Sequence, residues 1–453
     1  MNFAKKIYLL LISLIGVHVL ILSSLQFTAW PEMLSFPYMI NNGFTIYKDF
    51  HHVYQPLLTF ILLGVYKIFG FNLLTLKFFT FTLIVLIDLM IFLNLKKLTK
   101  KNLLSLSVLA LYVFLQPIFD GNMLWYDVAV ILPILVSVYF LKSNLFMSGL
   151  FVAISFLVKQ QAVLIGLPMF IYLLVTKTKK KDVLSFIYGC ALPVLVLATM
   201  LQAAKLFPDY LFWTFEFPLL HLPKIPGYAI LPNSREIKIF AVVAATLLAG
   251  FALNYKKLNE DPVKVKFYLL LSILFFLVLS AFPRFSLFHL QPALAVFVIL
   301  LGVLMSFNRK FFIVLIIPIF FLWKNVLVSS NFEDRFYGAG EKQFASELKS
   351  RSIGEKVYLL GPNSVEYVMS GTIPPKPWIE NYVWHFEIPG VQEKMIDGWK
   401  IDPPIYIYWS KPKSGNWHDL ATYQPQKIVK YINTNYIKID EIDNVEIWKV
   451  VKI

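Results

Sequence analysis

The sequence is poor in charged residues and almost free of cysteine. Only 15% of its 453 residues are charged, whereas 58% are hydrophobic and 17% are aromatic. A soluble domain carries about 25% charged residues, so this composition disfavours both a soluble enzyme and a disordered chain. Cys190 is the single cysteine. A disulfide within the chain and a cysteine-based metal site are therefore excluded.

Nucleotide-binding motifs are also lacking. The sequence contains no G-x-x-x-x-G-K-[ST] loop and no G-x-G-x-x-G element after a strand. Gly361-Pro362-Asn363 follows the apolar segment 357–360, but a single Gly-Pro turn is weak evidence for a phosphate loop. A reaction that uses a nucleotide-sugar donor is therefore disfavoured.

Long apolar runs are what the sequence has in abundance. A run of about 20 apolar residues can cross a bilayer as a helix, because lipid offers the backbone no hydrogen-bond partner. We expect about eleven spans, those between residues 127 and 176 being short. The first is expected to be a retained helix, since no small-residue cleavage pattern follows it. The expected spans are 7–28, 72–95, 102–118, 127–141, 146–158, 161–176, 183–206, 237–254, 267–282, 288–306 and 310–328.

The formal net charge of +15 is distributed unevenly. Residues 1–328 hold 27 basic and 11 acidic residues, whereas residues 329–453 hold 15 and 16. Every second short loop between the expected spans is rich in lysine. The positive-inside rule therefore predicts a cytoplasmic N-terminus and a tail on the outer side. The positive charge thus indicates topology, and nucleic-acid binding is disfavoured. We expect a multi-pass protein of the cell membrane with two domains, residues 1–328 and 329–453.

The fold class expected from these patterns is mainly α. A polytopic bundle of about eleven transmembrane helices carries outer juxtamembrane helices and is followed by a small C-terminal α/β extracytoplasmic domain. In that domain we expect helices at 339–350 and 426–433, and strands at 356–360, 405–409, 436–439 and 445–451. The first two strands are expected to be buried, since each is an apolar segment ahead of a turn.

The first outer loop, residues 30–55, is not a plain polar connection. Pro31 and Glu32 predict the start of a helix, which Asn41-Asn42-Gly43 would end. The apolar segment 57–69 is too short to span, which favours a helix lying at the membrane interface. The loop contains Glu32, Asp49, His51 and His52, which are residue types that hold a divalent metal or activate a hydroxyl. Interfacial packing is the alternative for the two histidines.

Three further outer elements carry candidate residues. Asp127 opens an apolar helix, where it serves either as a cap or as a second functional carboxylate. Lys159-Gln160 lies between two short apolar segments, so its ammonium group either reaches the interface or holds a phosphate. Arg284 and His289 stand at adjoining helix ends, and a guanidinium fork suits a phosphate group.

The order of these elements resembles the GT-C membrane glycosyltransferases, in particular the protein O-mannosyltransferase and aminoarabinose transferase type. The similar features are an acid after the first span, Asn42-Gly43, the aromatic-basic-Asp-Phe element 47–50, and Tyr-x-Pro-Leu at 54–57. The acidic pair of this superfamily is Pro31-Glu32 here, so only its second member is matched. The resemblance implies transfer of a sugar from a polyprenyl-phosphate donor to an extracytoplasmic lipid, glycan or protein acceptor.

The resemblance also implies roles for the candidate residues. Glu32 or Asp49 would activate the acceptor hydroxyl, Lys159 and Arg284 would bind the donor phosphate, and Gln160 would contact substrate. The residues left for a metal or for substrate are Asp127, His289, His51 and His52. A divalent ion, Mg²⁺ or Mn²⁺, is required by some members of the superfamily and not by others.

Two other functions remain open at this point. A transporter or flippase of a lipid-linked saccharide would use a similar basic and aromatic groove. It is disfavoured because the candidate polar residues gather on one side and Asp88 is the one acid well inside an expected span. A structural membrane scaffold would leave the outer carboxylates unexplained.

Overall fold

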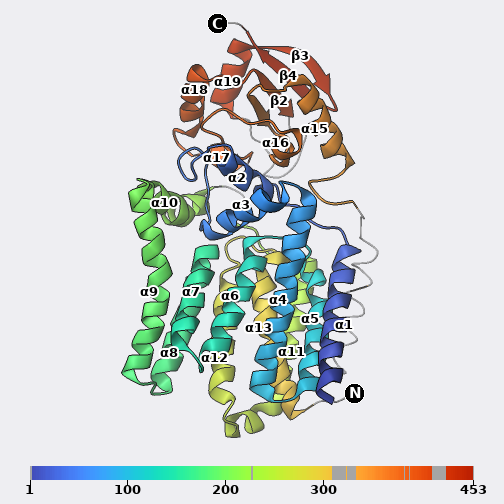
Figure 1. Ribbon diagram of the computed structural model, residues 1–453, viewed down its shortest axis with the longest axis vertical. Helices are drawn as coiled ribbons and strands as arrows, with labels where there is room; N and C mark the ends of the chain where they lie inside the picture. The colour runs from blue at the N-terminus through green and yellow to red at the C-terminus, as the bar shows by residue number, and fades with distance from the viewer. Residues whose placement is uncertain are drawn as a thin grey trace. The chain divides into compact units, whose positions relative to one another are not determined.

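The computed structural model describes residues 3–225, 228–308, 323, 333–381, 383–386, 388–410 and 425–451 (Figure 1). The chain forms two compact units, each assembled from separate segments. Unit 1 comprises Met1–Phe27, Lys77–Met200 and Ala229–Phe332, and unit 2 comprises Thr28–Leu76, Leu201–Tyr228 and Glu333–Ile453. The last boundary lies close to the expected division at residues 328/329. The segments 28–76 and 201–228, however, group with the C-terminal part.

Unit 1 is a bundle of helices. Most of its elements are long and apolar, as the hydrophobic runs predict. They are α1 (Phe3–Ser23), α4 (Leu73–Thr99), α5 (Asn102–Leu115), η1 (Pro117–Phe119), α6 (Tyr126–Phe140), α7 (Leu145–Val158), η2 (Gln160–Ile165), α8 (Gly166–Val175), α9 (Lys180–Ala203), α11 (Ser234–Glu260), α12 (Lys264–Leu279), η5 (Leu287–Leu290) and α13 (Gln291–Phe307).

Six of the described helices are long and apolar enough to cross a membrane, which is the pattern of a multi-pass membrane protein. They are Lys5–Ser23, Leu73–Thr99, Asn102–Phe119, Lys180–Ala203, Ser234–Glu260 and Leu287–Phe307. The expected spans between 127 and 176 also fold as helices, but as short ones: α6 has 15 residues, α7 has 14 and α8 has 10. The expected span at 310–328 lies outside the described residues, Trp323 apart.

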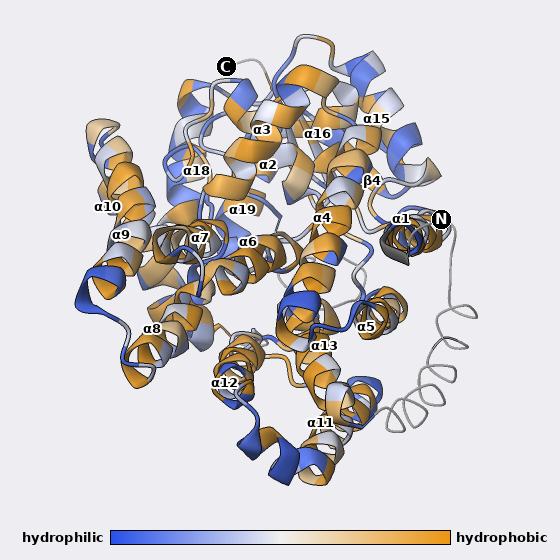
Figure 2. Cartoon of the chain, turned by 60° about the horizontal axis from the view of Figure 1, so that its bottom comes forward, coloured by the Kyte–Doolittle hydropathy of each residue, from blue (hydrophilic) through white to orange (hydrophobic). Residues whose placement is uncertain are grey.

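The helices of unit 1 are mostly hydrophobic along their length, and hydrophilic residues gather near helix ends (Figure 2). On α9, large side chains such as Leu195 and Met200 are 63% and 65% exposed, and on α11 Leu248 is 67% exposed. Water would penalise apolar area of this extent, whereas lipid does not. These faces are therefore suited to contact acyl chains.

Polar side chains join the short helices α6 and α7. The Ser137 hydroxyl donates to the backbone oxygen of Ser148 at 2.8 Å, and the Ser148 hydroxyl donates to that of Ser137 at 2.9 Å. Asn144 caps α7 by accepting from the Met147 amide. Such paired hydroxyls hold helices together where the hydrophobic effect does not.

Buried amides fix the connection between η1 and α6. Gln291 donates to the backbone oxygens of Gln116 and Phe119, and Gln116 donates to that of Gly121. The Asn122 amide donates to three carbonyl oxygens at and just after the end of α1. This loop therefore has a fixed course, and it delivers the first turn of α6 to a defined place in unit 1.

Unit 2 combines short helices with a four-stranded sheet. Its helices are α2 (Glu32–Asn41), α3 (Leu57–Phe69), α10 (Phe207–Leu211), η3 (Phe212–His221), η4 (Leu222–Lys224), α15 (Ala339–Arg351), α16 (Val365–Ser370), α17 (Val383–Phe386), α18 (Val391–Ile401) and α19 (Gln426–Asn435). Its strands are β1 (Val357–Leu360), β2 (Tyr406–Ser410), β3 (Tyr436–Ile442) and β4 (Val445–Val450).

The sheet has the order β1-β2-β4-β3. Strands β1 and β2 are parallel, whereas β4 pairs antiparallel with both β2 and β3. Asp443 and Asn444 join β3 to β4 with positive φ angles of 47° and 65°, the conformation of a tight hairpin turn. Strand β1 is buried at all four positions, as its apolar run predicts. The two helices and four strands expected in the tail are confirmed, and none of their ends is shifted by more than three residues.

The first loop also folds as expected. Helix α2 begins at Glu32, whose carboxylate lies at the positive end of the helix dipole, and it ends where Asn42 and Gly43 follow. Helix α3 spans Leu57–Phe69 and stops at Gly70, which has a φ of +90°. The Tyr66 hydroxyl of α3 donates to the Met33 backbone oxygen at 3.1 Å, which ties the two helices together.

Candidate functional site

Unit 1 brings three of the predicted residues into one buried network. Lys159, which follows α7, lies with its Nζ 2.5 Å from Asp127 Oδ1. The ring Nδ1 of His289 lies 2.8 Å from Asp127 Oδ2. The side chains of Lys159 and Asp127 are 5% and 1% exposed, and that of His289 is 12% exposed. One carboxylate thus serves a buried cation and a histidine at the end of the bundle where α6 begins.

This arrangement narrows the alternatives for Asp127 and Lys159. Asp127 fits neither a simple helix cap nor a metal ligand, because both its oxygens have partners. Lys159 does not snorkel to an interface, since its ammonium group is buried and paired. A carboxylate acceptor implies that Nδ1 of His289 carries the hydrogen, which makes Nε2 the acceptor nitrogen of that ring.

Arg284 lies beside this network. Residues 283–285 pair with Ile230 through two backbone hydrogen bonds, Ile230 N to Pro283 O at 3.0 Å and Phe285 N to Ile230 O at 2.8 Å. The positive charges of Lys159 and Arg284 both act on the His289 ring. Gln160 is the first residue of η2, directly after Lys159. With one carboxylate and two permanent cations, the network has an excess of positive charge.

Unit 2 places a second carboxylate near Glu32. Glu32 and Glu380 are both buried, and burial followed by the charge of Glu32 raises the pKa of Glu380 to about 8. Ser364 donates to Glu380 Oε2 at 2.5 Å and lies 3.0 Å from the hydroxyl of Ser35 on α2. Like charges in a buried site cannot both ionise readily. The pair therefore retains a proton near neutral pH.

Neutral imidazoles lie next to this carboxylate pair. His385 donates from Nδ1 to the Glu380 backbone oxygen at 2.9 Å, and its ring centroid is 5.6 Å from that of His51. His51 stacks on Trp213 at 3.9 Å. Burial lowers the pKa of His385 to about 3 and also lowers that of His51. The buried Nδ1 of His51 has no hydrogen-bond partner among the described residues, which suits it to bind a ligand group.

His52 is a structural residue. Its Nδ1 lies 2.8 Å from the Tyr54 backbone oxygen and its Nε2 lies 2.9 Å from the Thr59 hydroxyl, so both ring nitrogens are used. Its ring contacts Phe36 and Tyr47, and burial lowers its pKa to about 4. The packing interpretation of this histidine is the one that the geometry favours.

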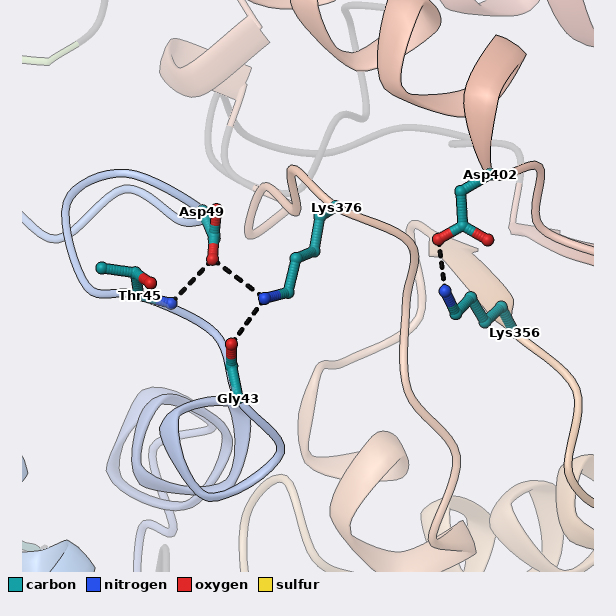
Figure 3. Close-up of polar contacts among 6 residues, drawn as sticks. All are labelled: Gly43, Thr45, Asp49, Lys356, Lys376 and Asp402. Atoms are coloured by element: carbon teal, nitrogen blue, oxygen red, sulfur yellow. Dashed lines mark hydrogen bonds and ion pairs between the residues drawn. The ribbon is translucent and has the colours of Figure 1, made fainter.

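Asp49 is also engaged by its surroundings (Figure 3). Its Oδ2 accepts the Thr45 amide at 2.8 Å and lies 3.0 Å from Lys376 Nζ, which also donates to the Gly43 backbone oxygen. Trp378 donates its amide to the Asp49 backbone oxygen at 2.8 Å. The carboxylate therefore holds the loop of residues 43–49 to the proline-rich segment 374–378, and Glu32 is the better placed candidate base.

The residues present do not fit a resident divalent metal. Among the described residues, no group of three or more His, Cys, Asp or Glu side chains is placed to hold an ion. Asp127 and His289 meet in unit 1 but Lys159 takes the remaining Asp127 oxygen, and in unit 2 His52 has no free nitrogen. The described side chains are therefore not arranged for metal-dependent chemistry.

Several residues of these sites were not found from sequence. Glu380, Ser364, His385 and Trp213 come from segments far from Glu32 in the chain, and none of them stands in a local pattern that would single it out. In unit 1, His18 Nδ1 lies 2.8 Å from Asp88 Oδ2, and both side chains are fully buried. Asp88 is thus half of a polar pair within the bundle, which removes one argument against a transport pathway.

The comparisons with known proteins bear on the fold alone. No family model matches the chain, and no curated protein matches its sequence. The chain is similar in structure to "Crystal Structure of ArnT from Cupriavidus metallidurans bound to Undecaprenyl phosphate". The match covers 99% of this chain and 98% of that chain, with a TM-score of 0.46 and 11% sequence identity. The bound lipid is a feature of that protein.

Proposed function

We propose that this protein is an integral membrane glycosyltransferase that moves a sugar from a polyprenyl-phosphate donor to a hydroxyl of an extracytoplasmic acceptor. The observation that carries the proposal is the buried pair of Glu32 and Glu380, in which burial followed by the charge of Glu32 raises the pKa of Glu380 to about 8. General-base activation of a hydroxyl requires such a group, held away from bulk water. The resemblance of the first loop to GT-C transferases supports the same chemistry.

The proposed reaction is a single displacement at the anomeric carbon. The acceptor hydroxyl gives its proton to the Glu32 carboxylate, and its oxygen forms a bond to the anomeric carbon. The bond from that carbon to the donor phosphate breaks, and its electron pair stays on the phosphate oxygen. Among the residues of unit 1, Lys159 and Arg284 carry positive charge of the kind that stabilises a leaving phosphate, and Asp127 and His289 position Lys159. The orientation with this chemistry on the outer face belongs to the proposal.

The test uses the full-length protein reconstituted in lipid. A radiolabelled polyprenyl-phosphate hexose and cell-envelope acceptors are supplied, and transfer of label is measured. Glu32→Gln is expected to lower the rate at least 100-fold, the usual contribution of a general base. Glu366→Gln is the matched control, because Glu366 is also buried in unit 2 but is not placed in the carboxylate pair.

Asp49→Asn separates the two candidate bases. The proposal expects this variant to keep most of its activity and to lose some stability, because Asp49 fastens a loop. Full activity of Glu32→Gln, or abolished activity of Asp49→Asn in a folded protein, would overturn the assignment of Glu32 as the base.

Transport of a lipid-linked saccharide is a second candidate, favoured by the His18–Asp88 pair. A buried ionisable pair within a helical bundle is a feature of proton-coupled pathways. Movement of the donor across a vesicle membrane without sugar transfer, abolished by Asp88→Asn, would support this function. Sugar transfer that persists in Asp88→Asn would argue against it.

A further inference from the structure

A group of lysines lies at the opposite end of unit 1 from the Asp127 network. Lys97 is in the last turn of α4, Lys142 follows α6, and Lys266 is in the first turn of α12. All three line one pocket, together with Asn94 and Tyr139. Helix α6 has Asp127 in its first turn and Lys142 just past its end, so about 22 Å of helix separates the two places.

The pocket is strongly positive. Among the described residues its lining contains three lysines and no carboxylate. Burial, followed by the charges of Lys142, Lys97 and Lys100, lowers the pKa of Lys266 to about 8. Like charges that converge at a partly buried place repel one another unless an anion lies between them. The protein supplies no such anion in the described part of the chain.

The lysines at this end differ in whether their ammonium groups have partners in the protein. Lys101 donates to the backbone oxygen of Ser306 at 2.8 Å, at the end of α13. Lys97 donates to the Tyr139 backbone oxygen and lies 4.3 Å from the centre of the Tyr139 ring. Lys142 and Lys266, in contrast, make no ion pair or side-chain hydrogen bond with any described residue. Lys101 and Lys97 therefore have structural partners, and Lys142 and Lys266 have their ammonium groups available to a ligand.

We propose that the pocket lined by Lys97, Lys142 and Lys266 binds a phosphate group. The pocket has a volume of about 20 Å³, which is room for roughly one water-sized group. One phosphate oxygen fits the pocket, and the rest of the phosphate group and its substituent stay outside it. Basic pockets between membrane helices recognise lipid headgroups in this way. The same chemistry suits a lipid phosphate or a soluble phosphate ester, and the site is independent of the proposed sugar transfer.

The experiment measures ligand binding by the full-length protein. In one arm the protein is placed in nanodiscs of phosphatidylcholine with or without phosphatidic acid, and bound lipid is counted by native mass spectrometry. In the other arm, inorganic phosphate is titrated against protein in phosphatidylcholine alone. The double variant Lys142→Gln/Lys266→Gln is compared with Lys180→Gln, an exposed lysine of α9 outside the pocket.

We expect the double variant to bind the phosphate-bearing ligand at least tenfold more weakly, and Lys180→Gln to behave as the native chain. Binding of phosphatidic acid alone assigns the site to a lipid headgroup, and binding of inorganic phosphate assigns it to a soluble phosphate compound. The proposal is overturned if the native chain retains neither ligand, or if the double variant and Lys180→Gln lose the same amount of binding. Monodispersity of each variant on gel filtration shows that the comparison is made on folded protein.

Discussion

At the scale of single residues, burial decides what each ionisable group does. Glu32, Lys159 and His52 were all candidates from sequence, but each has a different environment. Glu32 lies near a second carboxylate, Lys159 is paired with Asp127, and His52 is held by two hydrogen bonds. The same residue types in water would be interchangeable loop charges, and the low dielectric around them gives each one a separate role.

The ion pair of Asp127 and Lys159 gives the first prediction. Removing one partner of a buried pair leaves an uncompensated charge, which costs about 3–5 kcal/mol of unfolding free energy. Asp127→Asn and Lys159→Met are each expected to lower stability by an amount of this order. The double variant should recover a large part of the loss, because no charge is left alone. The measurement is a double-mutant cycle, in which thermal unfolding of the native protein and the three variants is compared in one detergent. If the losses of the two single variants simply add in the double variant, the two side chains are not coupled.

A second prediction concerns acid stability through His52. Its folded pKa of about 4 lies below the ordinary value of 6.5, so the unfolded chain binds the proton first. The resulting stability is fully present above pH 6.5 and is lost as pH falls towards 4. At pH 5 this loss is roughly 2 kcal/mol.

The measurement for His52 is the difference between two pH profiles. Glu380 acts in the opposite sense, since its raised pKa lowers stability as pH rises from 4.5 to about 8. Comparing native protein with His52→Gln cancels that contribution. The variant should be less stable at pH 8 and should show a smaller further loss at pH 5. Parallel profiles for the two proteins would show that His52 titrates normally in the fold.

At the scale of elements, helices in unit 1 are held by close backbone approach as well as by side chains. A Cβ placed on Gly149 of α7 would lie 2.0 Å from the Phe186 backbone oxygen, and one on Gly189 of α9 would lie 2.2 Å from that of Phe146. The two helices therefore touch through their glycines. Small residues at such a contact permit association without a hydrophobic driving force.

The third prediction follows from this contact. Gly189→Leu must push α9 away from α7, because the atoms it meets belong to backbone and cannot rotate aside. We expect a loss of several degrees in the melting temperature, or loss of folded protein. Gly16→Leu is the control, since Gly16 also lies within a helix and has open space around its Cβ position. Equal behaviour of the two variants would contradict the close α7–α9 contact.

At the scale of the whole molecule, segments distant in sequence form one unit. Unit 2 joins the first loop to the tail through the pairing of Phe50 with Trp378 and of Thr28 with Arg335. Phe36, Phe50 and Trp378 pack together, and Asp49 pairs with Lys376. The tail is therefore not an appended domain, because part of its core comes from residues 28–76.

The fourth prediction is that truncation after residue 328 damages the first loop. Without the tail, Phe36 and Phe50 lose the aromatic partner that covers them, and their exposed area favours aggregation. We expect faster proteolysis within residues 42–56 of the truncated protein than in the full chain. Replacing Lys376 by Met in the full chain is the milder control, since it removes one partly exposed ion pair. Equal protection of residues 42–56 in the truncated and full chains would contradict a shared core.

The elements of the fold were largely predictable, because they rest on local patterns. Apolar runs predict the helices of unit 1, and Pro31-Glu32 and Asn42-Gly43 predict the ends of α2. Apolar segments ahead of turns predict buried strands in the tail. The number of full-length spans was less predictable. Segments such as 127–141 and 146–158 are apolar enough for a bilayer, but loops pinned by Gln116, Asn122 and Gln291 and the cap at Asn144 limit the length of the helices.

The candidate sites were predictable in part. Asp127, Lys159 and His289 were selected one by one, since each is a polar residue beside an apolar run, but their pairing depends on three helices meeting. Glu380 and His385 carry no local signal, because their burial is produced by α2 and the loop that contains His51. The orientation in the membrane, the sugar transfer and the role of Gln160 remain predictions.

The scarcity and placement of charge in the sequence determined by themselves that this chain is built for a membrane, since local composition is enough to decide solubility in lipid. They also determined most helices and strands through periodicity and turn residues. Tertiary structure alone decided which carboxylates share a proton, which lysines are paired and which are not, and that the first loop and the tail form one unit. These properties depend on contacts between distant segments and on the exclusion of water, and local sequence patterns determine neither of them.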